Sequence, residues 1–124
     1  MKTKNILIVD DQKNVAMILA SSLAKFENCG VEVVYDGQTA VEKCREQFFD
    51  LVVADYQLPD LTGIQVAIAL QEISPKTKVV LITALRVTMI EETIEQDNIH
   101  YFLEKPFPLQ QFLDVIEEAF ENVT

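Results

Sequence analysis

Five polar residues follow apolar runs of the chain and carry side chains that could do chemistry. They are Asp10, Asp11, Asp55, Thr83 and Lys105. Three carboxylates brought together repel one another, so such a group needs a compensating cation. Because these ligands offer oxygen, with no histidine or cysteine beside them, the pattern favours a hard ion, Mg2+ or Mn2+. A lysine and a hydroxyl beside that ion suit an incoming phosphoryl group, which one carboxylate would attack.

These residues converge on one edge if the apolar runs before them are parallel strands of one sheet. Short apolar runs predict five strands, at Ile6 to Val9, Val31 to Tyr35, Leu51 to Ala54, Val79 to Ile82 and Tyr101 to Leu103. Three of these runs are continuously apolar, which is typical of strands covered on both faces of a parallel sheet.

Amphipathic stretches between the strands predict helices. Apolar residues at helical spacing mark a first helix from Val15 to Phe26 and a last one from Leu109 to Phe120, with others near Gly37–Gln47, Gly63–Ile73 and Thr88–Gln96. Alternating strands and helices with right-handed crossovers form a doubly wound α/β fold. Functional sites in such folds lie outside the carboxyl ends of the strands, where the five polar residues stand.

Length and charge exclude several classes of protein. The 124 residues are expected to form one domain, residues 1–124. Ten Lys and Arg against 20 Asp and Glu give a net charge of −10, which argues against binding to nucleic acid or to an anionic membrane surface. The apolar runs are too short to span a bilayer, and no signal peptide pattern precedes Asp10. We therefore expect a cytoplasmic chain in which Cys29 and Cys44 are reduced.

Five stretches of the chain resemble the receiver domains of two-component response regulators, the CheY-like family. They are Ile6 to Asp11, Asp50 to Asp55, Leu58 to Gly63, Ile82 to Ala84 and Glu104 to Phe107. The resemblance covers the whole chain. It implies a flavodoxin-like, five-stranded parallel sheet of order 2-1-3-4-5 with five flanking helices. It also implies phosphotransfer from a histidine kinase or a His-containing phosphotransfer protein.

The same resemblance implies a role for each acidic residue. Asp55 would be the nucleophile that becomes the aspartyl phosphate. Asp11 and Asp55 would bind Mg2+ directly, with the backbone carbonyl of Gln57 as a further ligand, and Mn2+ could substitute. Asp10 would act mainly through a metal-bound water.

The remaining site residues are implied to form the switch. Lys105 would pair with the phosphoryl oxygens, and its bond to Pro106 would be cis. Thr83 would move toward the phosphoryl group on activation, together with an aromatic residue three positions before the lysine. That residue is Phe102, which lacks the hydroxyl with which a tyrosine could stabilise an inward state. Strand alternation puts Tyr101 and Phe102 on opposite faces.

The output is less defined than the phosphorylation site. The stretch Leu85–Gln96 with Tyr101–Leu103 is expected to be the face that binds a downstream domain or protein, on the fourth helix, fifth strand and fifth helix. The tail after Lys105 has acidic residues and no Lys or Arg, which disfavours a basic dimer face there. Both a monomer and a phosphorylation-dependent dimer fit. His100 is expected in a solvated loop before the fifth strand.

Two other classes of protein use similar folds. A Mg2+-dependent phosphatase with an aspartyl-phosphate intermediate typically carries a second aspartate two residues after the nucleophile as general acid, and here that position is Gln57. A nucleotide or flavin binder is expected to have a glycine-rich phosphate loop after the first strand, where this chain has Asp10 and Asp11. We therefore expect a signalling switch and not an enzyme with a separate substrate.

Overall fold

A computed structural model describes residues 3–84 and 99–121 of the chain. These residues form one five-stranded parallel sheet of order β2-β1-β3-β4-β5, which confirms the predicted order. The strands are β1 (Lys4–Val9), β2 (Cys29–Val34), β3 (Leu51–Asp55), β4 (Lys78–Thr83) and β5 (Ile99–Glu104).

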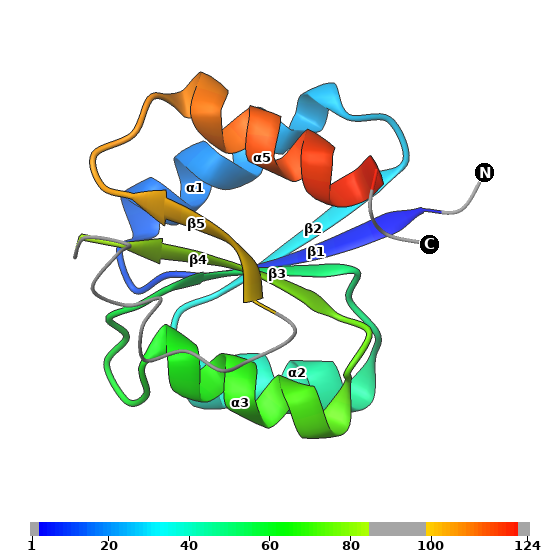
Figure 1. Cartoon of the computed structure of the whole chain (residues 1–124), viewed down its shortest axis with the longest axis vertical. Coiled ribbons are helices and arrows are strands. Elements are labelled where there is room, and N and C mark those ends of the chain that lie inside the picture. Colours follow the sequence, from blue (N-terminus) through cyan, green and yellow to red (C-terminus); the bar gives the residue numbers. More distant parts are fainter. Residues whose placement is uncertain (1–2, 85–98, 122–124) are drawn as a thin grey trace.

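Helices cover both faces of the sheet. They are α1 (Lys13–Ser22), continued by the short 3-10 helix η1 (Leu23–Lys25), then α2 (Gly37–Glu46), α3 (Gly63–Ile73) and α5 (Leu109–Glu121). Figure 1 shows α1 and α5 on one face and α2 and α3 on the other. The predicted helix at residues 88–96 lies outside the described residues.

The sheet divides the apolar core into two clusters. Leu7 and Val9 of β1 point toward α2 and α3 and pack with Leu70, whereas Ile6 and Ile8 pack with Phe112 on the side of α1 and α5. Both faces of the central strands are therefore buried, which explains why their sequences are continuously apolar and do not alternate.

Side-chain caps explain where α2 and α3 begin. The Asp36 carboxylate accepts the Thr39 backbone N–H at 2.7 Å before α2. Thr62 and Gln65 form a capping box before α3, because the Gln65 N–H donates to Thr62 Oγ1 and the Thr62 N–H donates to Gln65 Oε1. Each cap satisfies backbone donors that have no partner inside the helix.

His100 lies in a strand, so its prediction as a loop residue is wrong. Val79 pairs with Ile99 and Val80 with Tyr101, which leaves His100 as an extra residue in an irregularity of the β4–β5 ladder. Because Ile99 pairs with β4 before this irregularity and Tyr101 pairs with β4 after it, β5 begins at Ile99 and includes His100.

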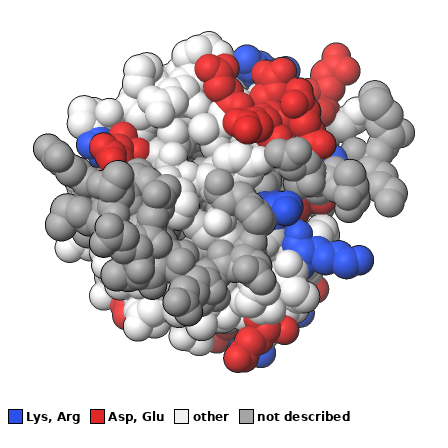
Figure 2. Space-filling model, in the orientation of Figure 1, with Lys and Arg blue, Asp and Glu red and all other residues white. Residues whose placement is uncertain are grey.

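Helix α5 is amphipathic and is packed at both of its ends. Phe107 stacks near Phe112 with ring centroids 6.5 Å apart, and Phe26 meets Phe120 edge-on at 5.6 Å. Its exposed face is acidic (Figure 2), formed by Asp114, Glu117, Glu118 and Glu121. This face agrees with the expectation that α5 carries no basic surface.

The two cysteines are free thiols. Cys44 is buried on α2, and this burial raises its pKa to about 11. Cys29 is partly buried, which also raises the pKa of its thiol. Across the two described ranges, we find no helix with the length and apolar character that a bilayer crossing requires.

Candidate phosphorylation site

The strand ends bring the predicted site residues together. Asp10 and Lys105 directly follow β1 and β5, while Asp55 and Thr83 end β3 and β4. Backbone pairing between β4 and β5 continues to the first residue after β5: the Lys105 N–H donates to the Thr83 carbonyl at 2.7 Å. One pocket is lined by Asp11, Asp55, Thr83 and Lys105, together with Gln57.

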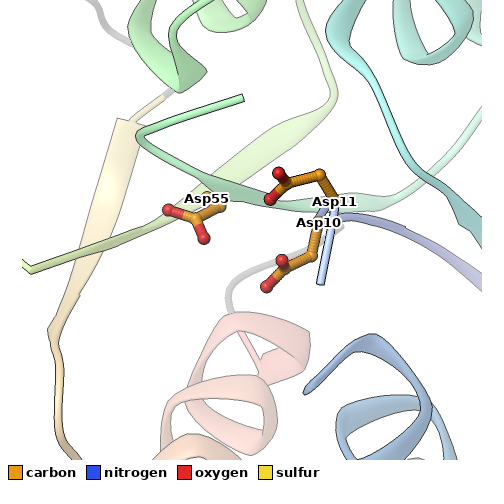
Figure 3. Close-up of side chains that lie close together, drawn as sticks. All are labelled: Asp10, Asp11 and Asp55. Atoms are coloured by element: carbon orange, nitrogen blue, oxygen red, sulfur yellow. The ribbon is translucent and has the colours of Figure 1, made fainter. Parts of the chain in front are cut away.

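Three carboxylates cluster beside this pocket, two of which, those of Asp11 and Asp55, line it. One oxygen from each of Asp10, Asp11 and Asp55 lies within 4.8 Å of the others (Figure 3). Asp10 and Asp55 are buried and Asp11 is exposed. Carboxylates held at this spacing repel one another, so the site favours a cation among them.

The buried carboxylate of Asp10 lacks a full set of partners. Its Oδ1 accepts the Gln12 N–H at 2.9 Å, but its Oδ2 has no hydrogen-bond partner among the described residues. Burial raises the pKa of Asp10, and the charges of Asp55 and Asp11 raise it further. The Gln12 bond and Lys105 act in the opposite direction without cancelling this effect.

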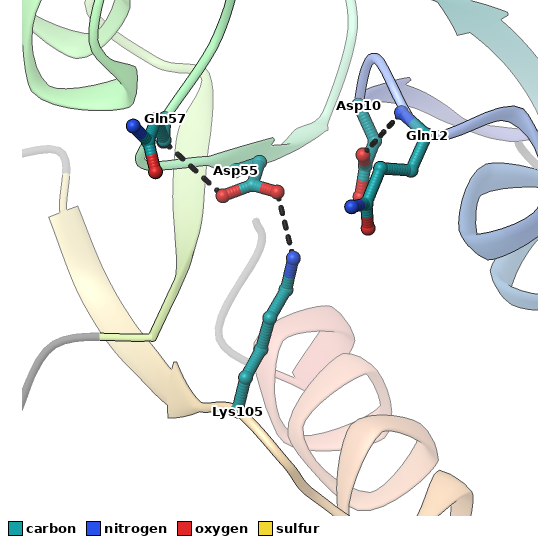
Figure 4. Close-up of polar contacts among 5 residues, drawn as sticks. All are labelled: Asp10, Gln12, Asp55, Gln57 and Lys105. Carbon is teal, nitrogen blue, oxygen red and sulfur yellow. Dashed lines mark hydrogen bonds and ion pairs between the residues drawn. The ribbon is translucent and has the colours of Figure 1, made fainter.

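Lys105 reaches the central carboxylate. Its Nζ donates to Asp55 Oδ2 at 2.7 Å, and the Gln57 N–H donates to Asp55 Oδ1 at 3.2 Å (Figure 4). One lysine does not balance the three carboxylates around it. The oxygen-only donor set and the unpartnered Asp10 Oδ2 therefore fit a hard divalent cation such as Mg2+.

The two aromatic residues of β5 face opposite sides of the sheet, as predicted. Phe102 packs against the cluster on the α2 and α3 side, and Tyr101 packs against the other cluster. Thr83 is fully buried at the end of β4. The Lys105–Pro106 peptide bond is cis, as the sequence resemblance implied.

The loop between β3 and α3, residues 56–62, is fixed at its base. Gln57 and Thr62 form an antiparallel bridge, and the Gly63 N–H donates to the Tyr56 carbonyl at 2.8 Å. A Cβ atom on Gly63 would lie 2.6 Å from the Asp55 carbonyl oxygen, so only glycine allows this approach. The sequence reasoning missed Asp60 in this loop, although a Pro-Asp step is a turn signal.

Comparison with known proteins identifies the family. The sequence model of the response regulator receiver domain family matches residues 6–117 of this chain. The chain therefore belongs to this family. The chain is 30% identical over 108 residues to response regulator ArlR of Staphylococcus aureus, in a match that covers 87% of this chain and 48% of ArlR. The chain thus spans about half the length of this curated relative.

Solved receiver structures share the fold. The receiver domain of Francisella response regulator 1452 has a TM-score of 0.87 at 21% identity, covering 98% of this chain and 100% of that one. The response regulator TrrA of Thermotoga maritima, solved in complex with Mg2+-BeF, has a TM-score of 0.82 at 23% identity and covers 94% and 99%.

Replacing Asp10 with asparagine is expected to stabilise the metal-free chain. The amide oxygen of an asparagine can still accept the Gln12 N–H. The substitution removes one of three repelling charges, and its amide NH2 group can donate to the two carboxylates that remain. The expected gain is about 1 kcal/mol, or roughly 4 °C in the midpoint of thermal unfolding. Circular dichroism melts without divalent cations measure this gain.

Added Mg2+ is expected to raise the midpoint of the unsubstituted chain and to raise that of Asp10→Asn by less. The variant Asp114→Asn is the matched control, because it changes an exposed carboxylate on α5 that does not line the pocket. A lower midpoint for Asp10→Asn in the metal-free melts would show that the Asp10 charge is already compensated.

Proposed function

We propose that this chain is a phosphoacceptor domain that receives a phosphoryl group on Asp55. The donor is a histidine kinase or a His-containing phosphotransfer protein, as family membership suggests. The observation that supports this most directly is the Asp55–Lys105 ion pair inside a cluster of three carboxylates. The domain comprises residues 1–124 and works in the cytoplasm, where such kinases have their ATP.

In this proposal, Asp55 acts as a nucleophile. A carboxylate oxygen of Asp55 forms a bond to phosphorus while the P–N bond of the donor phosphohistidine breaks. The electron pair of that bond stays on the imidazole nitrogen, and the ring leaves as neutral imidazole because its other nitrogen carries a proton. Asp11 lines the pocket and is exposed to solvent, so the donor can approach Asp55 from this side.

The acidic cluster holds the cation. Asp11, Asp55 and the backbone carbonyl of Gln57 would hold Mg2+, or Mn2+ in its place, with Asp10 acting through a bound water. When bound, the ion supplies positive charge that stabilises the phosphoryl oxygens in the transition state. The Mg2+-BeF complex of TrrA is consistent with this assignment.

Lys105 and Thr83 bind the other phosphoryl oxygens. Before phosphorylation the Lys105 ammonium pairs with Asp55 Oδ2. After phosphorylation it forms its ion pair with a phosphoryl oxygen instead. Thr83, at the end of the neighbouring strand, donates its hydroxyl to another. The Lys105 N–H is bonded to the Thr83 carbonyl, so the two residues lie side by side next to the pocket.

The switch couples this pocket to an output face. Movement of Thr83 toward the phosphoryl group vacates space that Phe102 fills, which alters the part of the output face that residues 101–103 form. Residues 85–96, which are predicted to belong to the same face, lie outside the described residues. That face binds a downstream domain or protein. The chain therefore acts as a signalling switch, either as a monomer or as a phosphorylation-dependent dimer, and has no separate substrate.

Beryllofluoride with Mg2+ is expected to bind at Asp55 and to shift the backbone amide resonances of Tyr101 and Phe102, as well as those around the pocket. A ligand shifts an equilibrium only by its differential affinity for the two states. Heteronuclear NMR titration measures the shifts, and Asp55→Asn is the control that should abolish them. Shifts confined to the loops that hold Asp11, Asp55 and Lys105 would contradict the coupling to the output face.

A further inference from the structure

Asp60, at the tip of the β3–α3 loop, is bonded to a distant helix. Its Oδ1 accepts the Gly37 N–H at 2.8 Å and its Oδ2 accepts the Gln38 N–H at 2.9 Å. Oδ1 also accepts the Leu61 N–H at 2.9 Å. Gly37 and Gln38 are the first two residues of α2, so this carboxylate binds the end of the helix where free N–H groups point outward.

Helix α2 has a cap of its own. The Asp36 carboxylate, directly before the helix, accepts the Thr39 N–H at 2.7 Å. The N-terminus of α2 is therefore shared between a local cap and a carboxylate from the loop that follows Asp55. Hydrogen bonds from Gly37 and Gln38 lower the pKa of Asp60, so this exposed carboxylate is charged at neutral pH.

Close packing accompanies the hydrogen bonds. A Cβ atom on Gly37 would lie 2.9 Å from Leu61 Cβ and 3.1 Å from Val66 Cγ2. The start of α2 thus rests directly on the loop and on α3. The base of the loop is held by the Gln57–Thr62 bridge, and its tip is held against α2 through Asp60.

We propose that Asp60 is a positioning residue that clamps the β3–α3 loop to α2 and so fixes Gln57 beside Asp55. This inference rests on the proposed function, in which the Gln57 carbonyl binds the metal. The Gln57 N–H already bonds Asp55 Oδ1, so a shift of the loop would move both ligands together. Residues that do not touch a metal but orient its ligands matter for binding, because their substitution lowers metal affinity or activity by about 10- to 100-fold.

The test compares Mg2+ affinity, measured by calorimetry, in Asp60→Ala, Asp60→Asn and Asp36→Ala. Asp60→Ala is expected to weaken Mg2+ binding about tenfold. Asp60→Asn keeps one oxygen for Gly37 and should recover part of the loss. Asp36→Ala is the matched control, because it removes a cap from the same helix without touching the loop, and it should bind Mg2+ like the unsubstituted chain.

Amide hydrogen exchange without Mg2+ gives a second measurement that does not depend on the proposed function. Asp60→Ala should speed exchange at Gln57 and Gly63 about tenfold, because a loop released from α2 opens more often, whereas Asp36→Ala should not. Equal Mg2+ affinity and unchanged exchange in Asp60→Ala, or equal losses in Asp36→Ala, would overturn the clamp. Failure of the unsubstituted chain to bind Mg2+ would instead refute the proposed function, and the exchange measurement would still decide on the clamp.

Discussion

Asp55→Asn is expected to abolish phosphorylation of the chain by acetyl phosphate, with a loss of at least about a thousandfold in rate. The amide has the shape of the carboxylate and can still accept the Gln57 N–H, which Asp55 Oδ1 accepts at 3.2 Å. Its oxygen is neutral and a poor nucleophile, so the bond to phosphorus cannot form at a useful rate. Mass spectrometry of the intact chain measures the added phosphoryl group.

The matched control is Asp114→Asn, which neutralises an exposed carboxylate that accepts a hydrogen bond from Gln110. This variant should be labelled like the unsubstituted chain, and circular dichroism should show that both variants keep their fold. Full labelling of Asp55→Asn, with an acid-stable product, would place the modification on another residue and refute the assignment.

Gly63→Ala is expected to destabilise the chain and to slow phosphorylation together. The new methyl group would lie 2.6 Å from the Asp55 carbonyl oxygen and 2.6 Å from Leu81 Cδ1. The Leu81 atom is the end of a side chain that can turn, but the carbonyl oxygen belongs to the backbone of Asp55, the proposed phosphoacceptor. Overpacking of this kind costs about 1–3 kcal/mol, or on the order of 5–10 °C in the midpoint of thermal unfolding. Thermal melts and acetyl phosphate labelling measure the two effects.

Gly30→Ala is the matched control for this substitution. Its new methyl group would meet Asn5 Oδ1 at 2.8 Å, and that atom is the far end of a side chain that can rotate. Gly30→Ala should therefore lose less stability and keep its labelling rate. If Gly63→Ala were as stable and as readily phosphorylated as the unsubstituted chain, close approach of this glycine would not position Asp55.

The elements specified by neighbouring residues could be predicted from the sequence. Helix α3 spans the expected residues, Gly63 to Ile73. Its start is predictable because the capping box of Thr62 and Gln65 is formed within four residues of the chain. The residues at the strand ends can be predicted from the sequence as well. The order of the strands, together with the resemblance to receiver domains, places Asp10, Asp55 and Lys105 at one edge of the sheet.

Features that depend on distant partners could not be predicted in this way. The position of His100 follows from the pairing of Ile99 with Val79 on another strand. Asp60 looks like a surface turn residue until α2 is placed beside it, since Gly37 precedes it by 23 positions. Strand β1 begins at Lys4, earlier than its apolar run, because ladder bonds depend on the backbone and not on side-chain polarity.

The division of the core by the sheet has a consequence for sequence divergence. Leu70 packs among residues on the α2 and α3 side, and Phe112 packs among residues on the α1 and α5 side. Within residues 3–84 and 99–121, no side chain belongs to both clusters. Substitutions at sites without shared partners act almost independently on stability. Each half of the interior can therefore accumulate compensating substitutions at its own pace, while the strand backbones between them keep the edge that carries Asp10, Asp55 and Lys105 unchanged.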